Sequence, residues 1–482
     1  MTIYRQLEVP GCVRVFNLFA SVWWLALKAD VDSHLRKLCE IKCISAMRLR
    51  KLHRKTPEPP EYLPGVSIIK PLLGVDPFLQ ENIISHFELC YPNFEIIFCV
   101  EDPNDPAVEV VQLLLHKYPN VDAKLIIGGN GNVVNPLVNN ALPAYDAAKY
   151  DLIWMSTSRI KVNTDIMVEM VLKSEDPSVA LVHQLPFCTD QWSFINAVEK
   201  ICFGCALGRS AMALNQMEML CFTGMSYIFK KPILDRFGGF ARYGKFLAED
   251  YFLSKDLFEN GYKIKMSNYP AQQNIAGTNV TKYISRMVRW LRLRLNMLTI
   301  VAAFFEPMIE CVNLGFLLAL SLRYLFGVSM LTTMAVHISL WMVLDYLLLR
   351  CTQGGPLPFN VLTFMMAWWL REVLTYVIYA KAVLHPRTVK WGAHTYHLSL
   401  GGHTEAYHGV SSRSSLAAKR TKLTEPAPGI GVIFPEATLA KSKPEHAPLM
   451  SLKQGHSWRH SLPNGYIRAS VDHQNLTLTP EA

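Results

Sequence analysis

Four long apolar segments constrain this chain more than any other feature, because each is long enough to reach deep into a lipid bilayer. The first, residues 11–29, carries its only charges, Arg14 and Lys28, near its ends. A helix of this length spans the bilayer core at about 1.5 Å per residue. A signal peptide is the alternative, but few basic residues precede the segment and no small-residue cleavage site follows it. We therefore predict an uncleaved transmembrane anchor at 11–29.

Basic residues crowd the segment after this anchor and indicate its orientation. They are Arg36, Lys37, Lys42, Arg48, Arg50, Lys51, Arg54 and Lys55. Such an excess of Lys and Arg is typical of cytosolic flanks, and it suits an anionic membrane surface better than a nucleic acid. We expect a lumenal N-terminus at 1–10, a basic cytosolic linker at 30–63 and a large cytosolic region after it.

The other three apolar stretches lie late in the chain, at 298–322, 328–349 and 361–384. They contain charged residues that are costly in hydrocarbon unless they are paired or face protein. These are Glu306, Glu310, Asp345, Arg371 and Glu372. Three crossings would place the C-terminus in the lumen, whereas the basic juxtamembrane segment at 385–401 favours the cytosol. The region 298–384 is therefore interpreted as transmembrane or interfacial helices, with one stretch interfacial or re-entrant.

Four short apolar runs in the middle region predict an α/β sheet. They are Val66–Lys70, Phe94–Val100, Ala123–Ile127 and Asp151–Ser156. Their starts are separated by 28, 29 and 28 residues (94 − 66, 123 − 94 and 151 − 123), about the length of a βα repeat. Helical patterns lie at 77–89, 106–118 and 251–260. We predict a doubly wound sheet over 64–281, which binds ligands beyond the carboxyl ends of its strands.

Polar residues follow two of these strands and precede one of the helices. Asp102 follows the second strand, Thr157 follows the fourth, and Ala248-Glu249-Asp250 leads into the helix at 251–260. The sequence contains neither GxGxxG nor GxxxxGK[ST], which removes the main support for a Rossmann dinucleotide site or a P-loop. The single CxxC pair, Cys202 and Cys205, is interpreted as two buried thiols.

An amphipathic segment at 282–297 precedes the late apolar stretches. As a helix it places Lys282, Arg286 and Arg289 on one face and an apolar stripe on another. The stripe consists of Ile284, Val288, Leu291, Leu295 and Leu298. One interpretation is an interfacial helix with snorkelling basic residues. The other is that Arg286 and Arg289 bind a diphosphate, since the planar guanidinium binds two oxygens at once.

Several motifs, taken in order, resemble those of inverting membrane glycosyltransferases with a GT-A fold. The similarity is greater to ceramide glucosyltransferases and covers about residues 10–402. The segments that carry it are Pro64–Leu72, Tyr118–Ala123, Lys149–Trp154, Leu181–His183, Thr223–Ser226, Ala248–Phe252 and Ser285–Trp290.

This resemblance implies transfer of glucose from UDP-glucose to the primary hydroxyl of ceramide, with inversion, in a Golgi or ER membrane. The product would be glucosylceramide, and the step the first in glycosphingolipid synthesis. The resemblance makes Asp250 the general base and His183 a substrate-pocket residue. It places Asp102 in the nucleotide pocket with a metal ion, Mg²⁺ or Mn²⁺, and Arg286, Arg289 and Trp290 over the diphosphate and acceptor. No nucleic-acid partner is expected.

One residue departs from the family pattern. Thr157 occupies the position where the family has a metal-binding aspartate, and a neutral hydroxyl is a poor ligand for Mg²⁺ or Mn²⁺. Arg159 adds a positive charge nearby, while Asp151 lies at the wrong end of the strand to replace the missing carboxylate. Two alternatives stay open: a catalytically weakened paralogue that binds lipid or UDP-sugar, and another membrane glycosyltransferase. Residues 402–482 are predicted to form a disordered tail.

Overall fold

The computed structural model describes residues 52–54, 62–189, 193–275, 277–391 and 394–406 of the 482-residue chain. The predicted anchor at 11–29, most of the basic linker at 30–63 and most of the predicted tail lie outside these residues. The described chain continues beyond residue 402, where the tail was predicted to begin, because Thr404–Ala406 forms a strand.

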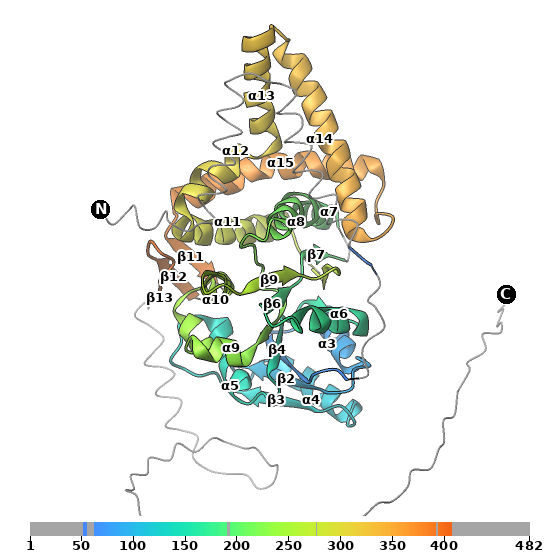
Figure 1. Cartoon of the computed structure of the whole chain (residues 1–482), viewed down its shortest axis with the longest axis vertical. Coiled ribbons are helices and arrows are strands. Elements are labelled where there is room, and N and C mark those ends of the chain that lie inside the picture. The colour runs from blue at the N-terminus through green and yellow to red at the C-terminus, as the bar shows by residue number, and fades with distance from the viewer. Residues whose placement is uncertain (1–51, 55–61, 190–192, 276, 392–393, 407–482) are drawn as a thin grey trace, which may run out of the picture. The chain divides into compact units, whose positions relative to one another are not determined.

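A seven-stranded mixed sheet lies at the centre of the middle region, in the order β3-β2-β1-β4-β8-β6-β9 (Figure 1). Its strands are β1 (Val66–Leu72), β2 (Phe94–Val100), β3 (Ala123–Ile127), β4 (Leu152–Ser156), β6 (Val179–His183), β8 (Ser226–Lys230) and β9 (Lys263–Met266). All four predicted strands are confirmed, with ends that shift by at most two residues. The β-branched and aromatic side chains of β1, β2 and β4 are almost all buried, which is why continuous apolar runs marked these strands, whereas the edge strand β3 is partly exposed.

The prediction of a doubly wound sheet needs a correction. Strands β1 to β4 run parallel, but β8 is antiparallel to both of its neighbours, β4 and β6. The indole Nε1 of Trp154 in β4 donates to Ser226 Oγ in β8 at 3.0 Å, inside the buried core. The sheet is therefore mixed, and the regular βα repeat ends at β4.

Helices cover the two faces of this sheet. They are α3 (Leu79–Phe87), α4 (Ala107–Lys117), α5 (Pro136–Asp146), α6 (Thr164–Ser174), α9 (Lys231–Arg236) and α10 (Glu249–Glu259). The helices predicted at 77–89, 106–118 and 251–260 are confirmed, with ends that shift by up to two residues. In the turn before α3, Asp76 Oδ1 accepts from the Phe78 N–H at 3.0 Å.

A second hydrophobic core lies between the sheet and the late apolar helices. It contains residues of α7 (Phe194–Ile201), the π-helix η2 (Cys202–Leu207), α11 (Val280–Met297) and α15 (Val361–Leu384). A small sheet of β5 (Ile160–Lys161), β10 (Ala271–Gln273) and β7 (Pro186–Cys188) connects it to the main sheet. The helix that follows η2, α8 (Gly208–Gln216), packs in a smaller neighbouring core with Leu185 and Leu348. Cys202 and Cys205 are buried free thiols in η2, as predicted.

The late apolar stretches form a hairpin and a separate helix. The π-helix η4 (Val301–Phe305) and α12 (Glu306–Met308) lead into α13 (Cys311–Phe326), which turns at Gly327 into α14 (Met330–Gln353). By length and composition, α14 and α15 can each cross a membrane, and the segments at Val301–Met308 and Cys311–Phe326, bent by 68°, form a third candidate. In Figure 1 the α13–α14 hairpin projects away from the sheet, whereas α15 runs across the base of the hairpin.

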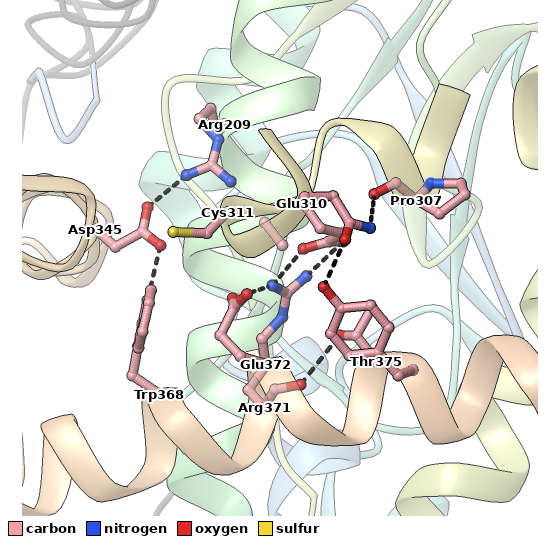
Figure 2. A network of polar contacts seen from close by, with 12 residues as sticks. Arg209, Pro307, Glu310, Cys311, Asp345, Trp368, Arg371, Glu372 and Thr375 are labelled. Carbon is pink, nitrogen blue, oxygen red and sulfur yellow. Dashed lines mark hydrogen bonds and ion pairs between the residues drawn. The ribbon is translucent and has the colours of Figure 1, made fainter. Parts of the chain in front are cut away.

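The charged residues of these stretches are paired, as their cost in hydrocarbon requires (Figure 2). Arg371 of α15 binds Glu310 through both terminal nitrogens, at 2.6 and 3.0 Å, and its Nη1 also lies 2.5 Å from Glu372 Oε1. Asp345 of α14 accepts from Arg209 of α8 at 2.5 Å and from the indole of Trp368 at 3.0 Å. The network connects both helices of the hairpin to α8 and α15.

Residues 388–406 form a small antiparallel sheet that the sequence analysis missed. Its strands are β11 (Thr388–Trp391), β12 (His394–Leu398) and β13 (Thr404–Ala406). Val389, Tyr396 and Leu398 bury a core with Leu247, directly before the Ala248-Glu249-Asp250 segment. The Leu247 N–H donates to Thr404 Oγ1 at 3.2 Å, so this sheet supports the entrance to α10.

Candidate active site

The carboxyl ends of the parallel strands bring together the loops that the sequence singled out. Lys70 of β1 is completely buried beneath the loop after β4. Its ammonium donates to the backbone carbonyls of Thr157 and Ile160 at 2.9 and 3.2 Å. Burial lowers the pKa of Lys70 to about 7, with the charge of Asp76 acting in the opposite direction. A buried amine therefore anchors the loop that carries Thr157 and Arg159.

Asp250 lies in the first turn of α10, half-buried against the segment at 223–225. Its Oδ2 accepts from the Gly224 N–H at 3.0 Å, and its Oδ1 accepts from the Tyr251 N–H at 2.8 Å. A Cβ on residue 224 would lie 2.5 Å from Asp250 Oδ2, so glycine allows this close approach. The helix N-terminus favours the ionised carboxylate.

Glu249 forms a second, fully buried carboxyl beside Asp250. Its Oε2 accepts from Asn135 Nδ2 at 2.6 Å, and Asn135 also caps α5. Burial raises the pKa of both carboxyl groups; that of Glu249 rises to about 8, with a further contribution from the charge of Asp250. At neutral pH this favours a protonated Glu249 beside an ionised Asp250, since adjacent buried carboxylates resist double ionisation.

Three guanidinium groups gather on the side of α11. Arg286 stacks its guanidinium over Phe203 and Trp290, with centroid distances of 5.6 and 5.8 Å, and it forms an ion pair with buried Glu199. Arg289 stacks over Trp391 at 5.1 Å. Burial lowers the pKa of Arg286 and Arg289, and the positive charge of Arg159 lowers both further. Arg159 is therefore electrostatically coupled to both arginines of the α11 motif.

A short path of backbone contacts connects Asp250 to this cluster. Gly224 binds Asp250, and the next residue, Met225, accepts from the Thr157 N–H at 3.1 Å through its carbonyl. Arg159 follows in the same loop, and its Nε lies 3.7 Å from Asp76 Oδ2 while its side chain is 43% exposed. The linked backbone segments therefore carry the carboxylate of Asp250 and the guanidinium of Arg159, whose charge also acts on Arg286 and Arg289 of α11.

Comparison with known proteins assigns a family to this arrangement. The sequence profile of glycosyl transferase family 21 matches residues 38–404. The chain belongs to this family. It is 41% identical over 353 residues to ceramide glucosyltransferase 3 of Caenorhabditis elegans, an alignment that covers 73% of this chain and 76% of that protein. It is 28% identical to ceramide glucosyltransferase of Komagataella phaffii, over 70% of this chain and 83% of that protein.

Membership of glycosyl transferase family 21 confirms the predicted glycosyltransferase and the resemblance to ceramide glucosyltransferases. Among solved structures, a mannosyltransferase from Pyrobaculum calidifontis in complex with GDP-Man and Mn²⁺ matches 72% of this chain and 94% of its own. The identity is 17% and the TM-score 0.44.

Two predicted site residues, Asp102 and His183, are not part of the hydrogen-bonded path from Asp250 to the loop that carries Arg159. Asp102 is exposed after β2, and its Oδ1 accepts from the backbone and side-chain amides of Asn104 at 2.9 and 3.1 Å. His183 is buried at the end of β6, opposite Tyr227 in the sheet and edge-on to Phe222 at 5.4 Å. Both keep their proposed roles as predictions.

The groups beside Thr157 do not provide suitable ligands for a divalent cation. The carbonyl of Thr157 already accepts from the ammonium of Lys70, and the nearby charged group of the loop is the guanidinium of Arg159. Hard cations need several oxygen ligands, preferably carboxylates. Within the described residues no group of three His, Cys, Asp or Glu side chains is placed to hold a metal ion.

Sequence reasoning missed three residues that shape the site: Lys70, Asn135 and Glu199. Each is a buried polar side chain within an otherwise apolar element or at its edge. Lys70 had a visible signal, because a lysine inside the buried run VSIIK must find hydrogen-bond acceptors. The partners of Asn135 and Glu199 are more than 80 residues away in sequence, at Glu249 and Arg286.

Proposed function

We propose that this chain transfers glucose from UDP-glucose to the primary hydroxyl of ceramide, in a GT-A-type catalytic domain at a Golgi or ER membrane. The observation that carries the proposal is the set of backbone contacts that joins Asp250, Gly224, Met225 and Thr157 in one site, with Arg159 in the same loop and its charge acting on Arg286 and Arg289 of α11. The donor and the acceptor are inferred from the names of the relatives and from the motif resemblance.

In the proposed reaction Asp250 is the general base. The ceramide oxygen attacks the anomeric carbon of glucose, the bond from that carbon to the UDP oxygen breaks, and the hydroxyl proton passes to Asp250 Oδ2 or Oδ1. Gly224 and Tyr251 hold the carboxylate by their N–H groups, which fixes its direction before reaction. A base positioned in this way contributes typically 10²- to 10⁴-fold to a rate.

The departing UDP gains negative charge, and we propose that guanidinium groups stabilise this charge. The charges of Arg286, Arg289 and Arg159 act on one another, and burial of Arg289 strengthens its attraction for an anion, whereas Glu199 balances part of the charge of Arg286. Preorganised cations aimed at developing charge stabilise the transition state. On this proposal Arg159 supplies part of the charge that a metal ion bound by aspartate supplies in relatives, while Asp102 contacts the nucleotide and His183 and Trp290 line the substrate pocket.

Thr157 also supports a second candidate, a weakened paralogue that binds UDP-sugar without rapid transfer. Purified protein with UDP-[¹⁴C]glucose and ceramide in mixed micelles separates the two. Radioactive lipid that requires both substrates supports the transferase. Saturable UDP-glucose binding without labelled lipid, under every metal condition, would support the binding protein and contradict the transferase.

A further inference from the structure

Most of the exposed face of α15 is apolar; its exposed polar groups are the ammonium of Lys381, in the last turn, and the hydroxyl of Tyr376. The apolar side chains of this face are Leu362, Met365, Met366, Trp369, Val373, Val377, Val383 and Leu384. They recur at helical spacing, opposite a buried face that packs on α7 and α11 through Phe364, Trp368 and Ile378. A continuous apolar stripe of this length on a membrane glycosyltransferase needs a partner that is itself apolar.

Both ends of α15 are attached to the side of the molecule that carries the sheet. Before the helix, Gln353 Oε1 accepts from Lys200 of α7 at 2.8 Å, and Leu357 and Phe359 pack into the core around α7 and α11. At the other end, Arg292 of α11 donates to the carbonyl of Lys381, in the last turn of α15, at 2.9 Å and to that of Thr388, after the helix, at 2.7 Å. These contacts hold the two ends of α15 against the same group of helices.

A helix that crosses a bilayer separates its two ends by the hydrocarbon thickness, about 30 Å. The catalytic region lies on one side of the membrane, so it cannot bind both ends of a crossing helix. The sheet β11-β12-β13, which follows α15, also packs against Leu247 beside the active site. The length and hydropathy of α15 are sufficient for a membrane crossing. The contacts at its two ends, which lie on the same side of the molecule, exclude one.

We propose that α15 lies in the plane of the membrane, with its exposed stripe in the acyl chains of the leaflet next to the catalytic region. The α13–α14 hairpin then crosses alone. Between Glu310 and Asp345 the hairpin carries one charged residue, Arg323, close to the turn at Gly327 and next to Tyr324. Arg and Tyr at such a turn suit the opposite headgroup layer.

The lengths of the helices agree with this arrangement. The 16 residues of α13 extend about 24 Å. An interfacial helix inserts its apolar face by about 5–10 Å, so α13 and α15 together match a hydrocarbon core of about 30 Å. The network of Arg371, Glu310, Glu372 and Asp345 then lies at the level of α15, shielded by α8 (Figure 2). Two crossings return the chain to its starting side, which agrees with the basic residues at 385–401.

This arrangement also places α11 at the surface of the same leaflet, because α11 packs along α15. Arg286, Arg289 and Trp290 therefore lie where a lipid with its hydroxyl in the headgroup layer can reach them. The membrane placement rests on packing and not on the proposed glucose transfer.

Spin labels measure the depth of α15 directly. Single cysteines at Leu362, Trp369, Val373 and Val383 are introduced after Cys12, Cys39, Cys43, Cys90 and Cys351 are replaced by serine. The full chain is reconstituted in liposomes, and depth is measured by EPR from collisions with oxygen and a nickel chelate. Labels at Leu331, Val336 and Leu340 on the exposed face of α14 provide the reference for a crossing helix.

We expect the four α15 labels to report similar depths near one interface, while the α14 labels change steadily with position. A crossing α15 would instead separate the labels at 362 and 383 by about 31 Å of depth, at 1.5 Å per residue, and that gradient would overturn the proposal. The depth readout is independent of glucose transfer, so it stands or fails separately from the proposed function.

A second measurement needs no change in α15. Asn475-Leu476-Thr477 is an N-glycosylation sequon after α15. With the catalytic region cytosolic, we expect no shift of the wild-type chain on treatment with PNGase F and the same mobility for Asn475→Gln. A glycan on Asn475 in a chain whose catalytic region is cytosolic would mean that α15 crosses.

Discussion

Residue-scale chemistry in this site depends on two neighbouring carboxyl groups with different tasks. Asp250 accepts hydrogen bonds from two backbone N–H groups, which favour its ionised form. Glu249 is instead fully buried, and burial raises its pKa to about 8. The buried amide of Asn135 holds Glu249 in place. A neutral Glu249 leaves Asp250 as the single negative charge, which is the state that a general base requires.

This pair predicts a pH effect. As pH rises through about 8, Glu249 loses its proton and places a second negative charge beside Asp250. Ionisation of Glu249 then raises the proton affinity of Asp250 and repels the diphosphate, so we expect the rate of glucose transfer to change near pH 8. In Glu249→Gln, which stays neutral, that change should disappear while the acidic limb that belongs to Asp250 remains. If Glu249→Gln keeps the change near pH 8, a group other than Glu249 is responsible for that change.

Thr157 gives a prediction about metal dependence. Without a carboxylate at this position, we expect EDTA to reduce wild-type activity by less than about tenfold, because guanidinium groups meet the diphosphate. Thr157→Asp should gain stimulation by Mn²⁺, although Arg159 can pair with the new carboxylate. Thr157→Asn, similar in shape and neutral, is the control. Strong EDTA inhibition of the wild type that Mn²⁺ reverses equally in all three proteins would place the metal on other residues.

At the scale of elements, the α13–α14 hairpin is anchored to its neighbours by ion pairs. Arg371→Met leaves Glu310 and Glu372 without their cation, and removal of one partner from a buried pair costs about 3–5 kcal/mol. We expect a marked fall in the melting temperature of the detergent-solubilised protein. Arg323→Met, at the exposed turn, should change it little. Equal melting temperatures for the two variants would argue that the network does not stabilise the hairpin.

The parallel half of the sheet was predictable from the sequence because β1, β2 and β4 are buried on both faces and read as apolar runs, and the partly exposed edge strand β3 follows at the same spacing. The direction of β8 was not, since antiparallel pairing with β4 depends on contacts such as Trp154 with Ser226. The sheet at 388–406 was missed because its strands are short, and the apolar side chains that bury its core, such as Tyr396, find their partner at Leu247, far away in sequence. The motif residues could be named from sequence, whereas Lys70 and Glu199 needed the fold.

At the scale of the whole molecule, the orientation rests on the basic residues that follow the predicted anchor. We expect the region at 64–295, which includes the catalytic domain at 64–281, to face the cytosol, since such flanks stay on the cytosolic side. Protease added to sealed microsomes should cut within this region without detergent, while a lumenal marker protein stays intact. Complete protection of the region until detergent is added would reverse the orientation.

Glucose transfer by wild type and Asp250→Asn tests the central claim most directly. The substitution keeps the shape of the side chain and removes its basicity. Glu259→Gln, on the exposed far end of α10, controls for general effects on that helix. With UDP-[¹⁴C]glucose and ceramide, we predict labelled glucosylceramide from the wild type and Glu259→Gln, and a loss of at least about 100-fold in Asp250→Asn. Equal rates in wild type and Asp250→Asn, or no labelled lipid from the wild type, would contradict the account.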